Sequence, residues 1–203
     1  MFYEPRHGHG LPHDPFKACV APRPIGWIST LSASGVANLA PFSYFNAVLD
    51  FPPTVMFSAS GPHREGPLKD TARNAIETGE FVYNIATWDL REKMNVSSSA
   101  VGRDVDEFEL AGLEKAPSLL VKPPRVAASP IQLECRTVHT LSLPCSRVGM
   151  ENRVVFGEVV GVHIDEAVLV AGQIDLTLVR PIARCGYQDF ALVEALFSMP
   201  RPG

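Results

Sequence analysis

The sequence lacks a charge excess, a long apolar run and the common nucleotide-binding motifs, and each absence narrows what the protein can do. Its 203 residues carry a formal net charge of −4. No extended basic field is present to hold nucleic acid, so we expect no nucleic-acid partner. The longest apolar runs, such as residues 167–171, are far too short to cross a bilayer, so we expect no membrane span. The first residues lack the basic start and apolar run of a secretory signal, which predicts a cytoplasmic protein.

Paired cysteine motifs and metal-binding spacings are also missing. None of the four cysteines forms a CxxC pair, and we interpret them as core thiols. Cys135 and His139 have a ligand-like spacing, but on a strand their side chains would lie roughly 13 Å apart, too far to share a metal. The histidines within residues 1–15 suit a polar tail better than a metal site. We therefore expect no metal centre.

Four fingerprints of nucleotide or hydrolytic enzymes are absent. The sequence contains no GxGxxG after a strand, no GxxxxGK[ST] loop, no GxSxG elbow and no HExxH helix. These absences argue against a Rossmann dehydrogenase, a P-loop enzyme, an α/β-hydrolase and a zinc protease.

What is present is a series of short β-like segments. A strand is predicted over residues 25–31, a turn at Gly35 and a return strand over residues 36–45. Further strands are predicted over residues 54–58, 80–86, 131–143, 153–165 and 176–184. Helices are predicted over residues 70–79, with Asp70 as N-cap and Gly79 as the stop, over 90–100 and over 189–199. The pattern indicates a β-barrel with helical additions, in which residues 1–18 form an arm and residues 19–203 one domain.

Polar residues are dense within the first half of this β pattern. A flat, partly polar ring needs apolar walls and hydrogen bonds, and the segment 38–46 offers both. A phosphate needs a cation, hydroxyls and a helix N-terminus, which Lys69, Thr71 and their neighbours offer. Plainer interpretations stay open: helix capping for residues 69–71, hairpin chemistry around Gly35, and core packing for Trp27 and the aromatic residues.

The motifs RPIGWIST (residues 23–30) and NLAPFSYFN (38–46) resemble those of the flavin reductase-like, FMN-binding split-barrel family. The resemblance continues in order through Pro52-Pro53, Ser58, KDT (69–71) and GEFVYN (79–84). Weaker similarities follow at residues 107–113, 134–135, 157–163 and 180–190. The sequence departs from the family pattern at residues 184–187, which puts contacts from that segment in doubt.

The resemblance implies a mainly β, six-stranded antiparallel split barrel with Greek-key connections and a few short helices, built as a homodimer with FMN near the interface. The residues expected to line the flavin ring and ribityl chain are Ser29, Thr30, Asn38, Ala40, Pro41, Ser43 and Tyr44. Those expected at the phosphate are Ser58, Ser60, Arg64, Lys69 and Thr71. Trp27, Asp70 and Asn84 complete the expected cofactor-binding set.

The function that follows is NAD(P)H-dependent flavin reduction, which needs positioned rings and no protein acid or base, so no catalytic residue is named. An oxygenase that receives reduced flavin is a possible partner. Three alternatives stay open: a non-catalytic flavin-binding module or electron carrier, a pyridoxamine-phosphate oxidase-like enzyme, and a structural protein. His163 is either a nicotinamide contact or a structural residue. The sequence does not choose between NADH and NADPH, or between FMN and FAD.

Overall fold

A single antiparallel sheet of seven strands forms the body of the computed structural model, which describes residues 1–61 and 65–202. The strand order is β3-β2-β6-β9-β10-β5-β4. The strands are β2 (Gly26–Leu31), β3 (Ala37–Phe42), β4 (Phe45–Asp50), β5 (Pro53–Ala59), β6 (Glu80–Ile85), β9 (Ile131–Leu143) and β10 (Asn152–Ile164).

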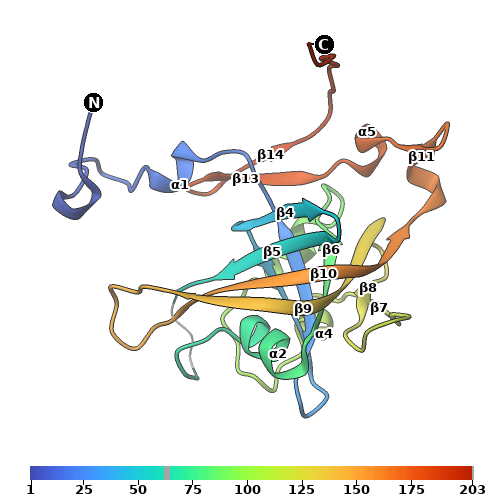
Figure 1. Ribbon diagram of the computed structural model, residues 1–203, viewed down its shortest axis with the longest axis horizontal. Coiled ribbons are helices and arrows are strands. Elements are labelled where there is room, and N and C mark those ends of the chain that lie inside the picture. Colours follow the sequence, from blue (N-terminus) through green and yellow to red (C-terminus); the bar gives the residue numbers. More distant parts are fainter. Residues whose placement is uncertain (62–64, 203) are drawn as a thin grey trace.

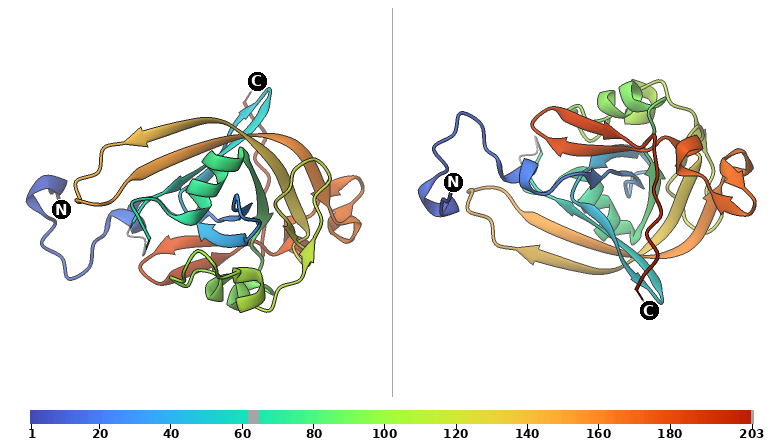
Figure 2. Two further views of the ribbon diagram at one scale, coloured as in Figure 1. Left: turned by 90° about the horizontal axis from the view of Figure 1, so that it is seen from below. Right: turned by 90° about the horizontal axis from the view of Figure 1, so that it is seen from above.

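The sheet closes into a barrel at the junction of β3 and β4. These strands lie at opposite edges of the sheet, yet only Ser43 and Tyr44 separate them, so the two edges must meet. The Ser58 N–H donates to the Tyr44 carbonyl across this corner at 2.8 Å. Figure 2 shows the strands curving around a common interior. The predicted barrel class is therefore correct, but the strand count is seven rather than six: the strand expected over residues 36–45 ends at Phe42, and a further strand, β4, begins after the corner and pairs with β5.

Aromatic residues fill the barrel interior. The Phe57 ring lies 5.2 Å from Phe42 and 5.3 Å from Phe81, and all three are buried. Gly157 on β10 makes this packing possible, because a Cβ there would collide with the Phe81 ring. A second buried cluster surrounds Trp27.

Short helices and small sheets surround the barrel. Figure 1 places α2 at one end of the barrel and the β13–β14 hairpin at the other, with the N-terminal arm extending away. No helix in the described part of the chain is long and apolar enough to span a membrane. The helical elements are η1 (Pro5–His7), α1 (Phe16–Cys19), α2 (Asp70–Thr78), α3 (Arg91–Val96), α4 (Glu107–Leu110), η2 (Glu166–Val168) and α5 (Leu176–Val179). The remaining strands are β1 (Arg23–Pro24), β7 (Lys115–Ala116), β8 (Arg125–Val126), β11 (Leu169–Val170), β12 (Gln173–Ile174), β13 (Ile182–Gly186) and β14 (Asp189–Leu192).

Two predicted elements near the C-terminus are wrong. The strand expected over residues 176–184 begins as a helical turn, α5, because the Asp175 carboxylate caps the Thr177 N–H, and only β13 is extended. The helix expected over residues 189–199 is instead strand β14 followed by coil, because β13 supplies a ladder of hydrogen bonds. The helix expected over residues 90–100 is shortened to α3.

Candidate functional site

The predicted polar residues of β3 and α2 meet at a cavity of about 280 Å³, which we call the inner cavity. β3 forms one wall, the start of α2 a second, and the segment after α3 a third. This arrangement joins segments that lie far apart in the sequence. The lining residues are Asn38, Ala40, Lys69, Asp70, Thr71, Ser97, Ser98, Ser99, Ala100, Val101 and Glu107.

Asn38 is fixed by a buried hydrogen-bond network. Its Oδ1 accepts from the Thr71 hydroxyl at 2.7 Å and from the Thr30 hydroxyl at 3.3 Å. Its Nδ2 donates to Glu107 Oε1 at 2.9 Å, and Asn74 Nδ2 donates to Thr30 at 3.1 Å. The network ties β2, β3, α2 and α4 together, so the shape of the inner cavity is set before any ligand arrives.

Glu107 is a buried acid in the wall of the inner cavity. Its Oε2 accepts the Leu39 N–H at 2.9 Å. Burial raises the pKa of Glu107 to about 7, and the nearby Asp70 carboxylate adds to the rise, although the hydrogen bonds from Leu39 and Asn38 oppose it. The sequence did not single out Glu107 as a site residue; its place in the 107–113 motif was the one available signal.

Lys69 supplies a cation at the mouth of the inner cavity. Its ammonium lies 5.9 Å from the centre of the Phe42 ring, and it forms no ion pair within the described residues. Burial lowers the pKa of Lys69, and the positive charge of Lys17 lowers it further. A partly desolvated cation beside a second cation is an arrangement that a bound anion would stabilise.

The start of α2 adds hydrogen-bond donors beside Lys69. The first intrahelical acceptor in this turn is the Lys69 carbonyl, which receives the Arg73 N–H at 3.0 Å, so the preceding N–H groups have no acceptor within the helix. Asp70 was expected to be the N-cap, but Lys69 holds that position. The Asp70 carboxylate instead pairs with Arg103 at 3.1 Å, which offsets its negative charge near the cavity.

A second cavity, of about 260 Å³, adjoins the inner one at Ser98, which lines both; we call it the middle cavity. Arg23 stands beside it, donating to the Ser43 hydroxyl at 3.4 Å and lying 5.8 Å from the centre of the Tyr44 ring. The residues around this cavity are Ile25, Pro41, Ser43, Met94, Asn95, Ser98, Arg184 and Phe190. Together the two cavities form one groove. The predicted cofactor contacts that line it are Asn38, Ala40, Pro41, Ser43, Lys69, Asp70 and Thr71.

Other predicted contacts lie behind this groove. Asn84 is fully buried, donating to the Trp27 carbonyl at 3.1 Å and the Ser29 hydroxyl at 3.4 Å, while accepting the Val126 N–H at 2.8 Å. The Trp27 indole donates to Ser97 at 2.9 Å. These groups hold the barrel wall to neighbouring loops.

Two predicted phosphate contacts lie elsewhere. Ser58 and Ser60 are half-buried at the end of β5 and are not in the lining of the inner cavity. Arg64 falls outside the described residues.

His163 is hydrogen-bonded to the buried Glu134, whose Oε1 lies 2.5 Å from His163 Nε2. Burial alone raises the pKa of Glu134, but backbone N–H groups from Leu119, Leu120 and Val121, with His163, outweigh it and lower the pKa. Glu134 thereby fastens the 119–121 segment to the barrel, and His163 is a further partner of its carboxylate.

Comparisons with known proteins agree with this architecture. The model of the flavin reductase like domain matches residues 19–177. An uncharacterized protein of Aquifex aeolicus is 37% identical over 168 residues, covering 82% of each chain. Nitrilotriacetate monooxygenase component B from Bacillus cereus superposes with a TM-score of 0.88 at 29% identity, covering 98% of each chain.

Two further structures share the fold. The 2-nitrobenzoate 2-nitroreductase of Pseudomonas fluorescens has a TM-score of 0.79 at 26% identity, covering 92% of this chain and 88% of its own. A split-barrel protein from Shewanella frigidimarina has a TM-score of 0.81 at 22% identity over the whole of both chains. The fold is thus a split barrel, and the chain belongs to the flavin reductase-like domain family.

Proposed function

We propose that the groove binds FMN, with its phosphate at the inner cavity and its ring toward the middle cavity. The observation that carries the proposal is Lys69: a partly buried cation without an ion-pair partner in the described part of the chain, at the start of a helix. A phosphate there would accept hydrogen bonds from the ammonium and from the first N–H groups of α2.

The rest of the groove suits a flat ring with a polar edge. Ala40 and Pro41 offer apolar surface, and the corner at Ser43 and Tyr44 exposes backbone and hydroxyl groups beside it. Each cavity alone is slightly below the roughly 300–1,000 Å³ of most ligand sites, but the two adjoin at Ser98 and can hold one extended ligand. The fixed network around Asn38 keeps this wall rigid.

We further propose that the protein is an NAD(P)H-dependent flavin reductase. FMN, when bound, supplies the acceptor for a hydride from the nicotinamide. The chain's own task is to hold two rings face to face and to exclude water, and this needs no acid or base at the reacting atoms. Membership of the flavin reductase-like family supports the proposal.

We propose a homodimer with FMN near the interface, formed through the β4–β5 hairpin and the adjacent face of β9. Phe51, at the tip of this hairpin, is 94% exposed, and Val138 and Leu141 on β9 are also exposed. Between them lies an apolar hollow of about 460 Å³ lined by Val48, Leu49 and Phe156, among others. An exposed apolar surface of this kind suits contact with a second copy.

An oxygenase that receives reduced flavin is the physiological partner that we propose. The support is the similarity to component B of a Bacillus cereus monooxygenase, which covers nearly the whole of both chains. The experiment described next distinguishes NADH from NADPH as the donor.

The proposed activity is tested by adding NADH or NADPH anaerobically to the FMN-loaded protein and following flavin absorbance. Bleaching is expected, and the donor that bleaches faster identifies the substrate. A flavin spectrum that stays unbleached with both donors would contradict the reductase and favour an electron carrier or a flavin-binding module.

A further inference from the structure

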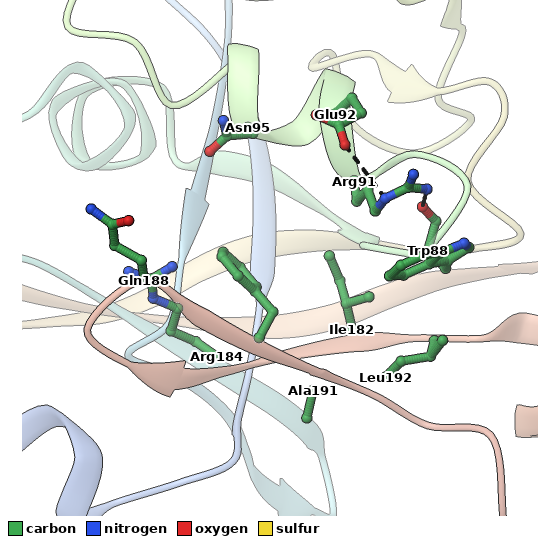
Figure 3. Close-up of a pocket in the computed structure, with 10 residues that line it drawn as sticks. Trp88, Arg91, Glu92, Asn95, Ile182, Arg184, Gln188, Ala191 and Leu192 are labelled. Atoms are coloured by element: carbon green, nitrogen blue, oxygen red, sulfur yellow. Dashed lines mark hydrogen bonds and ion pairs between the residues drawn. The ribbon is translucent and has the colours of Figure 1, made fainter.

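A third and larger cavity opens beside the middle one, between the segment that carries α3 and the β13–β14 hairpin (Figure 3). We call it the outer cavity; its volume is about 580 Å³. It shares Asn95, Arg184 and Phe190 with the middle cavity, so the two are continuous. Its other lining residues are Trp88, Arg91, Glu92, Ile182, Gln188, Ala191 and Leu192.

Arg184 stands at the junction of the two cavities. Its guanidinium lies 4.4 Å from the centre of the Phe190 ring and donates to the Tyr187 carbonyl. Within the described residues it forms no ion pair. Arg184 also lies directly opposite Arg23 in the β1–β13 ladder, and like charges facing each other across strands are destabilising.

Arg23 does not relieve this concentration of charge. It is 6% exposed, and its hydrogen bonds go to the Ser43 hydroxyl and to the carbonyls of Lys17 and Val20 rather than to a carboxylate. The β1–β13 ladder therefore pairs two arginine residues, and neither forms an ion pair within the described part of the chain. A bound anion that reaches Arg184 would stabilise it.

The walls of the outer cavity suit a planar group attached to that anion. Trp88 is 37% exposed, and Arg91 lies 3.9 Å from the centre of its ring. The acid nearest Arg91 is Glu92 at 3.5 Å, but the Glu92 side chain is 81% exposed and holds Arg91 weakly. Asn95 and Gln188 place amide groups on the side of the cavity that holds Arg184, away from Trp88 (Figure 3).

We propose that the outer cavity binds the adenosine diphosphate portion of the nicotinamide dinucleotide, with the diphosphate at Arg184 and the adenosine against Trp88. This inference rests on the proposed function, because it assigns a site to the hydride donor of that reaction. The continuity of the cavities lets the same molecule reach from Trp88 to the flavin groove at Pro41 and Ser43. A guanidinium group recognises phosphates, and an aromatic ring recognises a planar base.

The test is equilibrium binding of ADP to the FMN-loaded protein, followed by tryptophan fluorescence. The chain has two tryptophans, and Trp27 is fully buried, so a change on binding should come from Trp88 and disappear in Trp88→Phe. Arg184→Gln should weaken ADP binding roughly tenfold or more, as expected for a lost charge-assisted contact. The exposed Arg147→Gln is the matched control and should bind ADP as the wild type does.

Arg91→Gln is a second variant, which keeps the test decisive should Arg184→Gln fold poorly. It should weaken ADP binding while leaving FMN affinity unchanged, because Arg91 lines only the outer cavity. No saturable ADP binding to the wild type, or equal binding by the wild type and both variants, would overturn the proposal. Bleaching by NAD(P)H without ADP binding would refute this site alone; ADP binding without bleaching would refute the reductase activity and leave the site standing.

Discussion

Replacing Lys69 with methionine should separate cofactor binding from structural stability. Methionine preserves most of the apolar stem of the side chain while removing the ammonium that lies near the Phe42 ring. If the ammonium contacts the FMN phosphate, its loss removes a hydrogen bond between charged groups, worth about 1.5–3 kcal/mol. FMN should therefore bind about 10- to 150-fold more weakly, which quenching of FMN fluorescence measures directly.

The same substitution should not destabilise the protein without FMN. Burial and Lys17 lower the pKa of Lys69 in the folded chain, so holding the charged form there costs free energy at neutral pH, where the unfolded chain holds it freely. Removing the charge relieves that cost, and the free energy of unfolding should stay the same or rise. A Lys69 with a purely structural role would give the opposite result.

Lys122→Met is the control, because Lys122 is exposed and outside the lining of the groove. It should leave FMN affinity within about twofold of the wild type, since isolated surface charges contribute little. A Lys69→Met protein that is folded and binds FMN as tightly as this control would refute the placement of the phosphate.

Three further predictions concern the barrel, the buried acid and the oligomer. Burial raises the pKa of Glu107 to about 7, so its contribution to stability is present below about pH 4.5 and is lost as the pH rises through 7. Glu107→Gln should abolish this part of the pH dependence, which is worth at most about 3 kcal/mol. Urea unfolding curves collected across this pH range measure the effect. Gly157→Ala should cost about 1–3 kcal/mol in thermal unfolding because its Cβ would meet the Phe81 ring, whereas Gly161→Ala, whose nearest new contact is 3.4 Å away, should cost less; equal losses would contradict the packing argument. Phe51→Asp should convert the proposed dimer to monomers in light scattering, and an unchanged mass would place the interface elsewhere.

Local signals in the sequence predicted the elements that local chemistry determines. The hairpin at Gly35, which has a φ of 87°, and the end of α2 at Gly79, with a φ of 75°, follow from the freedom of glycine to adopt left-handed conformations. The two long strands β9 and β10 are rich in β-branched residues and were found within a residue of their ends. The resemblance to the family supplied the barrel type.

Long-range contacts could not be predicted from local sequence signals in the same way. The segment 189–199 has spaced apolar residues that suit a helix, but pairing with β13 makes its first part a strand. Residues 36–45 form one strand by pattern, and barrel closure bends them at Ser43. Glu107 reaches Asn38 across 69 residues of sequence, and no spacing rule indicates such a contact.

The most direct test of the central claim is whether the groove retains FMN. The purified protein, incubated with FMN and passed through a desalting column, should emerge with a flavin absorption spectrum in proportion to the protein, and Lys69→Met should emerge with less. A wild-type protein that retains no flavin would contradict the account, and equal retention by the wild type and Lys69→Met would contradict the site.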